Sequence, residues 1–238
     1  MFKPTTSHQR SADTRARILE TALQTFRRVG LDAATMRQIS KDAGVALGGA
    51  YYYFPSKEAI VQAFYESVQE KHRQRVLLAL AGGKLDFLER LRAAFHAKLD
   101  IVTGDQKFLG TLFRYAGEPG HPLSPLGEGA RKVRDESIAV FELAIGEERL
   151  PSDIRAFLPT ALWALHMTVL LYFVHDASPG QQRTRRLVDG ALALVVRLLG
   201  LVKLPILKPV RGSLVALLRD VRLFPEPLSP AAVSTQEE

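Results

Sequence analysis

The chain contains no cysteine among its 238 residues, and this absence removes several kinds of chemistry. Without thiols the protein can form no disulfide, no thiolate-ligated metal site and no cysteine nucleophile. Its six histidines lie at positions 8, 72, 96, 121, 166 and 175, without the close spacing that is typical of metal ligands. The sequence therefore predicts no metal site.

Sequence signatures of common enzymes are also missing. The chain has no G-x-G-x-x-G segment, no phosphate-cradling G-K-[ST], no G-x-S-x-G and no H-E-x-x-H. No pair of acidic residues stands alone in an apolar segment, where general acid–base catalysis would place it. We expect a protein that is not an enzyme and that carries no cofactor.

Long apolar runs are absent as well. The most hydrophobic run, residues 161–174, is shorter than the roughly 20 residues of a membrane span, and it contains His166. The first twelve residues have no apolar segment and so do not read as a signal peptide; we expect them to form a mobile basic tail. These features predict a cytoplasmic protein that does not associate with membranes.

The positive charge of the chain is concentrated near its start. The formal net charge is +7, and residues 1–57 hold nine Lys or Arg against four Asp or Glu, whereas the rest of the chain is nearly balanced. This asymmetry favours a head that binds a polyanion, attached to a nearly neutral body. The alternative is a basic surface that only keeps the protein soluble.

Apolar residues recur at helical spacing along most of the chain, and no convincing alternating strand pattern is present. Glycine and proline clusters separate the apolar segments. Pro159 falls inside one segment, where it marks either a kink or the true start of a helix. The pattern predicts an all-α protein with helices over residues 13–29, 35–43, 46–54, 57–81, 85–102, 107–116, 126–145, 154–174 and 181–201.

These helices group into a small three-helix head, residues 13–57, and a larger helical body, residues 58–224, which begins with a long connecting helix. A proline-rich tail follows over residues 225–238. Within the head, two short predicted helices are joined at Gly44 and Val45. A tight, glycine-containing joint between two short helices is typical of a helix-turn-helix, whose second helix enters the DNA major groove.

The second short helix carries an unusual sequence, LGGAYYY, at residues 47–53. Glycines lower helix stability but let the backbone approach base edges, and tyrosine hydroxyls can donate to phosphates. Lys57 lies at the start of the next helix, where free backbone N–H groups also favour a phosphate. The alternative is a poorly formed surface helix. The predicted DNA-binding residues are Thr35, Arg37, Leu47, Gly48, Gly49, Tyr51, Tyr52, Tyr53 and Lys57.

Residues 14–64 resemble the DNA-binding head of the TetR family of transcriptional regulators. The resemblance is carried by TMRQISKDAGV at residues 35–45, followed by Gly48, Tyr51, Phe54 and Lys57. The chain departs from the family pattern at Ala46, Ala50 and Tyr53, where a capping Ser or Thr, a larger aliphatic and a His are frequent. These departures leave the operator sequence open.

The resemblance implies a homodimer whose recognition helices read two half-sites of a pseudo-palindromic operator in double-stranded DNA. It also implies a body that dimerises and binds a small-molecule effector. We therefore expect a ligand-responsive regulator, most simply a repressor that the effector releases from DNA. A helical small-molecule carrier or interaction module with a non-functional basic head is the alternative.

Two segments of the body, residues 154–174 and 187–201, are apolar nearly all round, so each needs cover on every side. Either they are central to one subunit or they pack against a partner chain, and the resemblance places a dimeric four-helix bundle here. The candidate dimer-interface residues are Trp163, Leu170, Leu187, Ala191, Leu194 and Leu198.

Aromatic walls with a few polar points are typical of small-molecule pockets, and they favour an apolar or weakly polar effector. Each candidate could instead be an ordinary core residue, His166 above all. The candidate effector-binding residues are Phe95, His96, Phe113, Tyr115, His121, His166 and Met167.

Overall fold

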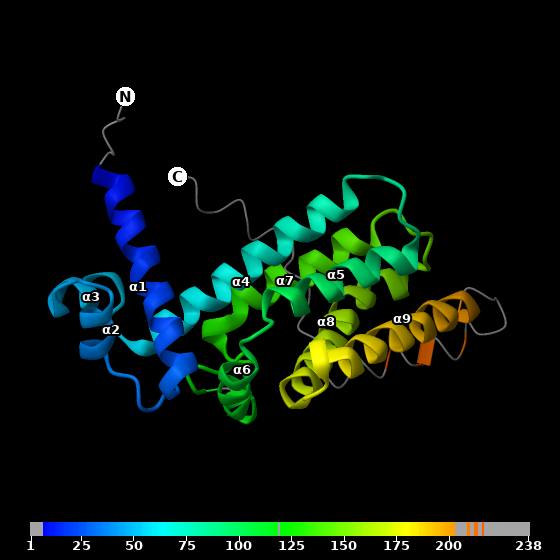
Figure 1. Cartoon of the computed structure of the whole chain (residues 1–238). Coiled ribbons are helices and arrows are strands. Elements are labelled where there is room, and N and C mark those ends of the chain that lie inside the picture. Colours follow the sequence, from blue (N-terminus) through cyan, green and yellow to red (C-terminus); the bar gives the residue numbers. More distant parts are fainter. Residues whose placement is uncertain (1–6, 119, 203–208, 210–211, 214–215, 217–238) are drawn as a thin grey trace.

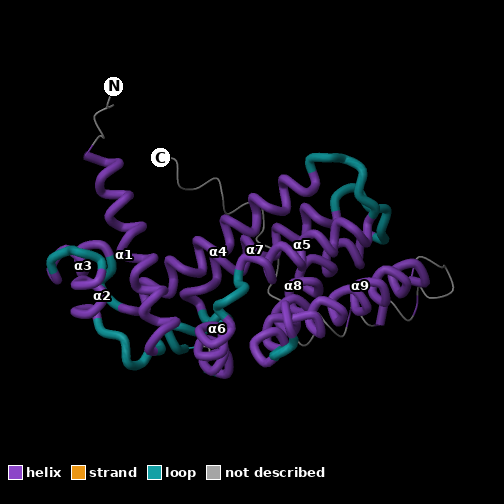
Figure 2. Tube along the Cα trace, in the orientation of Figure 1, coloured by secondary structure: helices purple, strands orange, loops and turns teal. Residues whose placement is uncertain are grey.

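The computed structural model describes residues 7–118, 120–202, 209, 212–213 and 216. Over these residues the chain contains helices and loops but no strand, as the all-α prediction requires (Figures 1 and 2). The α-helices are α1 (Ser7–Val29), α2 (Met36–Asp42), α3 (Leu47–Tyr53), α4 (Lys57–Leu80), α5 (Phe87–Ile101), α6 (Gln106–Phe113), α7 (Arg131–Ile145), α8 (Ser152–His175) and α9 (Gln182–Val202). Short 3-10 helices cover Arg114–Gly117, Glu128–Ala130 and Pro179–Gln181.

Helices α1, α2 and α3 form the head at one end of the molecule (Figure 1). Ile18 of α1, Ile39 of α2 and Ala50 of α3 are fully buried, and Phe54 closes this small core directly after α3. Burying each isoleucine and the phenylalanine contributes on the order of 2 kcal/mol, and the alanine methyl contributes less. This burial holds two seven-residue helices that would not be stable alone.

Helix α4 leads from the head into the body, where it packs against α5 and α7 (Figure 1). Its start is sharply defined, because the Ser56 hydroxyl accepts a hydrogen bond from the Ala59 N–H at 3.3 Å. Helix α5 begins with a capping box, in which Asp86 and Glu89 bond each other's backbone N–H groups. Local sequence therefore sets where both helices begin.

The head and body also meet through α6. Phe108 of α6 stacks on Phe26 of α1 with ring centroids 5.4 Å apart, and its edge meets Phe64 of α4 at 5.1 Å. The Arg27 guanidinium of α1 pairs with the buried carboxylate of Asp105, just before α6. Helix α6 thus contacts both the head and the first turns of α4.

One expectation is corrected. Helix α1 begins at Ser7, so residues 7–12 belong to a helix and not to a mobile tail, and Ser11 contacts α3. The predicted helix 154–174 corresponds to α8, which has 24 residues; Pro159 lies in its interior and does not mark its start. The proline-rich tail, residues 225–238, lies outside the described residues.

By length and composition alone α8 could cross a membrane, and among the described helices it is the only one that passes this test. Such a match is weak evidence, because the core helices of soluble proteins pass it too. Here 39% of its most apolar window is buried against the rest of the subunit. Its buried side chains, including Leu162, His166 and Phe173, face the other helices of the body.

Candidate nucleic-acid interface and internal cavity

The joint between α2 and α3 has the geometry of a helix-turn-helix. Gly44 has φ of +65°, a left-handed conformation that glycine adopts without steric cost. The following Val45 N–H donates to the Ser40 carbonyl at 3.0 Å, which folds the chain back after α2. Thr35 caps α2, since its hydroxyl accepts a hydrogen bond from the Gln38 N–H at 3.1 Å. The rest of the Thr35 side chain and the whole of Arg37 are exposed beside this cap.

Helix α3 buries Ala50 and exposes the opposite face. Leu47, Gly48, Tyr51 and Tyr52 are exposed, and Tyr52 keeps 81% of its surface accessible. A Cβ atom added to Gly48 would meet no atom outside its own helix within 4 Å. Packing within the subunit therefore gives no reason for a glycine at this position. An external partner that comes close to the helix backbone does give one.

Two of the predicted DNA contacts are engaged inside the head. The Tyr53 hydroxyl lies 3.2 Å from the Ser11 hydroxyl on α1. The Lys57 ammonium donates to the carbonyl oxygens of Leu31, at 2.7 Å, and Asp32, at 3.4 Å. Lys57 therefore ties the start of α4 to the loop after α1, and the third proton of its ammonium is available to another acceptor. Gly49 of α3 is half-buried.

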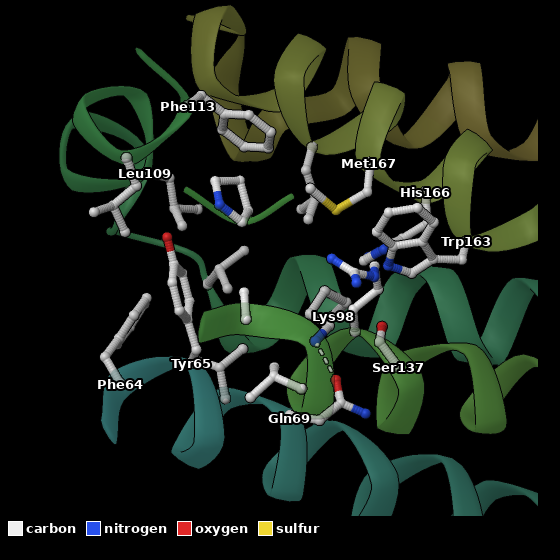
Figure 3. Close-up of a pocket in the computed structure, with 18 residues that line it drawn as sticks. Phe64, Tyr65, Gln69, Lys98, Leu109, Phe113, Ser137, Trp163, His166 and Met167 are labelled. Atoms are coloured by element: carbon white, nitrogen blue, oxygen red, sulfur yellow. Dashed lines mark hydrogen bonds between the residues drawn. The ribbon is translucent and has the colours of Figure 1, made fainter. Parts of the chain in front are cut away.

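The body contains a cavity of about 100 Å³ between α4, α5, α6, α7 and α8 (Figure 3). Its walls are mainly apolar and aromatic, with a few polar side chains. The residues that line it are Phe64, Tyr65, Val68, Gln69, Lys98, Val102, Leu109, Leu112, Phe113, Pro125, Ala130, Val133, Arg134, Ser137, Trp163, His166, Met167 and Leu170.

Three of the seven candidate effector residues, Phe113, His166 and Met167, line this cavity. The other four lie elsewhere. Phe95 is buried against Phe141, with ring centroids 5.2 Å apart, and the His96 ring nitrogen lies 3.0 Å from the Asp189 carboxylate of α9. The rings of Tyr115 and His121 stack on each other at 4.0 Å, outside the cavity.

Sequence reasoning missed the most polar residues of the cavity, Gln69, Lys98 and Arg134. Lys98 is only 6% exposed, and burial lowers the pKa of its ammonium to about 7. A signal was available: Lys98 follows the buried Leu91, Ala94 and Phe95 at helical spacing, so a lysine stands on the apolar face of α5.

Two buried histidines lie next to Lys98. The His166 ring stacks parallel to the His72 ring, with centroids 6.0 Å apart. Burial, and then the nearby Lys98 charge, lower the pKa of His72 to about 3 and the pKa of His166 well below its usual value. Both rings are therefore neutral at physiological pH. The basic groups of this region are Lys98, which with a pKa of about 7 is only partly protonated at that pH, and Arg134 of α7, which is charged and half-buried.

The outer faces of α8 and α9 expose large apolar side chains. On α9 the exposed leucines Leu187, Leu194, Leu198 and Leu201 recur at spacings of three, four or seven residues, which places them on one stripe. Ala191 lies half-buried within this stripe. The two α8 candidates for the dimer interface, Trp163 and Leu170, line the cavity, and Leu170 is only 8% exposed.

Within the described part of the chain, no group of three or more His, Asp or Glu side chains is placed to hold a metal ion. The head therefore contains a helix-turn-helix with an exposed second helix, and the body contains a mainly apolar cavity. Comparison with known proteins identifies its family.

The family model described as "Bacterial regulatory proteins, tetR family" matches residues 18–64, and the model "Tetracyclin repressor-like, C-terminal domain" matches residues 90–211. The chain belongs to the TetR family of bacterial transcriptional regulators. The resemblance that was identified in the head is thereby confirmed and extends over the body.

Similar curated proteins include the probable HTH-type transcriptional regulator ArpR of Pseudomonas putida, 32% identical over 84 residues, which are 35% of this chain and 40% of that protein. The HTH-type transcriptional regulator TtgR, also of Pseudomonas putida, is 36% identical over 64 residues, 27% of this chain and 30% of that one. These matches span less than half of either relative.

Among solved structures, a TetR transcriptional regulator from Nitrosomonas europaea superposes with a TM-score of 0.62. The match covers 76% of this chain and 96% of that one at 18% sequence identity, so it supports the fold alone.

Proposed function

We propose that the protein is a repressor that binds a pseudo-palindromic operator as a homodimer and leaves it when a small molecule occupies the cavity. The observation that carries this proposal is the exposed face of α3, where Gly48, Tyr51 and Tyr52 are accessible to a partner and where a Cβ atom at Gly48 would meet no atom outside its own helix. Its place of action would be the cytoplasm, where the DNA is.

The residues around α3 fit a duplex. Arg37 lies exposed in the first turn of α2, and Lys57 keeps one ammonium proton for a phosphate beside α3. Phosphate contacts from such residues position a protein, whereas side chains at the tip of the recognition helix select the bases. We assign the positioning role to Thr35, Arg37, Tyr53 and Lys57. The base-reading role falls to Leu47 and Tyr51.

The leucine stripe of α9 supports the dimer. A row of exposed leucines is unfavourable on a monomer in water, and a second copy would cover it by packing the same stripe against itself about a two-fold axis. Exposed Leu171 and Tyr172 on α8 would extend this surface. Two heads on one dimer could then contact successive half-sites, about one helical turn apart.

The route from cavity to head runs through α6 and α4. Leu109 and Phe113 of α6 line the cavity, while Phe108 of the same helix stacks on Phe26 in the head. Phe64 of α4 contacts both the cavity and Phe108. A ligand that displaces α6 would therefore change the position of the head, and through it the distance between the two recognition helices.

The test is fluorescence anisotropy with duplex DNA from upstream of the protein's own gene and with a random duplex, each at two salt concentrations. A regulator should bind the upstream duplex more tightly and lose affinity steeply as salt rises, since phosphate contacts release counterions. Tyr51→Ala should reduce the preference between the two duplexes. A protein that binds neither duplex at low salt would favour the alternative, a helical carrier with a non-functional head.

A further inference from the structure

The cavity contains a polar cluster, defined here as Gln69, Lys98 and His166, which is buried from solvent (Figure 3). The Lys98 ammonium donates to the Gln69 side-chain oxygen at 3.1 Å. The Gln69 amide nitrogen and both ring nitrogens of His166 have no hydrogen-bond partner among the described residues. The cluster therefore has more donor capacity than the protein itself uses.

A buried ammonium is costly unless a negative charge or several acceptors compensate it. Among the described residues that line the cavity none is acidic, and Arg134 adds a second cation to its wall. A methionine or leucine would fill the place of Lys98 at lower cost. The cluster is thus explained by an anion that arrives from outside, because hydrogen bonds between cationic donors and a carboxylate are short and strong.

The rest of the cavity is apolar. In Figure 3, Trp163 and Met167 of α8 lie opposite Gln69 of α4, with Lys98 between them. The volume of about 100 Å³ is comparable to the roughly 150 Å³ apolar cavity that holds a benzene molecule. The space fits a ligand with a small apolar body and excludes long chains unless the walls move.

We propose that the effector is a compact monocarboxylic acid with an apolar body. Its carboxylate accepts hydrogen bonds from the Lys98 ammonium and the Gln69 amide, and a His166 N–H can add a third. Its apolar body lies against Trp163 and Met167. This assignment rests on the proposed function, in which the cavity is the effector site, and it replaces the expectation of a merely apolar or weakly polar effector.

Binding of such an acid is coupled to protonation of Lys98. In the free protein the pKa of Lys98 is about 7, and a carboxylate at its side favours the charged form, so complex formation above that pH takes up a proton. Besides Lys98, the titratable or charged groups in and around the cluster are Tyr65 and His72 of α4, Arg134 of α7 and His166 of α8. Burial keeps Tyr65 and both histidines neutral near pH 8, so these groups do not supply this proton uptake.

The test is titration calorimetry of the full chain with benzoate and hexanoate, each matched to its neutral amide, benzamide or hexanamide. At pH 8, measurements in two buffers of different ionisation enthalpy report the proton uptake. We expect at least one acid to bind, its amide to bind about tenfold more weakly or worse, and about one proton to be taken up.

Lys98→Met should weaken acid binding about tenfold to a hundredfold and abolish the proton uptake. Lys71→Met, which removes an exposed lysine of α4, is the matched control and should behave like the wild type. Gln69→Glu provides a second test in case the Lys98→Met protein does not fold. Its carboxylate pairs with Lys98 from within, so it should raise the thermal unfolding midpoint and prevent acid binding.

Binding of neither acid, equal binding of acid and amide, or acid binding that neither variant weakens would overturn the proposal. DNA binding of the same samples is measured in parallel. If the wild type binds DNA but neither acid, the proposed class of effector is wrong, whereas the proposed function as a regulator stands. If no sample binds DNA but an acid binds and Lys98→Met weakens that binding, the proposed function is wrong, whereas the proposed class of ligand stands.

Discussion

Lys98 is a lysine in the interior of the body, bonded to Gln69 and without an acidic neighbour in the described cavity wall. Its ammonium loses hydration on folding, and one hydrogen bond does not replace it. The free protein therefore tolerates a residue that costs stability. Residues of this kind are typical of sites that function by binding something else.

The first prediction concerns this cost. The pKa of Lys98 is about 7 in the folded protein, below its unfolded value near 10.4, so between these values the unfolded chain binds more protons. Stability should accordingly rise with pH from about 7 to 10, with a contribution from Lys98 of roughly 3–5 kcal/mol over the window. Urea unfolding across this range measures it, and Lys98→Met should flatten the slope. Identical slopes in both proteins would contradict the prediction.

Lys57 has two roles that can be separated. Its ammonium stabilises the head by donating to the Leu31 and Asp32 carbonyls, and we assign its remaining proton to a phosphate. Lys57→Met should lower the free energy of unfolding by about 1–2 kcal/mol and weaken binding to upstream and random duplexes by the same factor. Lys41→Met, at an exposed position of α2, should leave the unfolding energy unchanged. A loss confined to one duplex would assign base reading to Lys57.

Among the elements, α3 is weak as a helix and is held by its neighbours. It has seven residues, two of them glycine, and its N-cap Ala46 provides no side-chain hydrogen bond. Ala50 and Phe54 attach it to α1 and α2 through the core of the head. Because one buried face is enough to hold this helix in place, the residues of its exposed face are not constrained by packing. They can therefore be suited to contact with DNA.

This weakness gives a prediction with opposite effects on stability and binding. Gly48→Ala should stabilise the head by a few tenths to about 1 kcal/mol, since the added methyl meets no atom outside its helix and alanine favours a helix. The same methyl should weaken operator binding, because it separates the helix from the bases. Thermal unfolding and anisotropy measure the two effects. Gly82→Ala, in the loop after α4, is the control and should not change DNA binding.

In the molecule as a whole, the described subunit leaves the α9 leucine stripe uncovered. Leu194, 57% exposed, lies near the middle of the stripe. We predict that Leu194→Lys converts a dimer into monomers, because a charge would be buried at the centre of the interface. Sedimentation or light scattering gives the mass, and operator affinity should fall with it.

Leu78→Lys is the matched control for this change. Leu78 of α4 is 77% exposed and lies outside α8 and α9, so the variant should keep the mass of the wild type. A wild-type protein that is monomeric at concentrations where it binds its operator would contradict the dimer, as would a Leu194→Lys variant that stays dimeric.

The class of fold, the positions of most helices and the helix-turn-helix head could be predicted from the amino-acid sequence. These follow from local rules: the Thr35 and Ser56 caps, the left-handed Gly44 and the helical spacing of apolar residues act within a few positions, and the structure has the corresponding helix starts and joint. The start of α1 was misjudged, since polar residues 7–12 have no apolar periodicity to mark them as helical.

The set of side chains that share the cavity, in contrast, depends on how the helices pack. Gln69, Lys98 and His166 come from three different helices, α4, α5 and α8, and Phe95, close to Lys98 on the same helix, packs into the core instead. Trp163 and Leu170 likewise line the cavity, whereas the leucines of α9 are exposed. Helical periodicity tells which face of a helix is apolar, but the packing of the helices determines what that face meets.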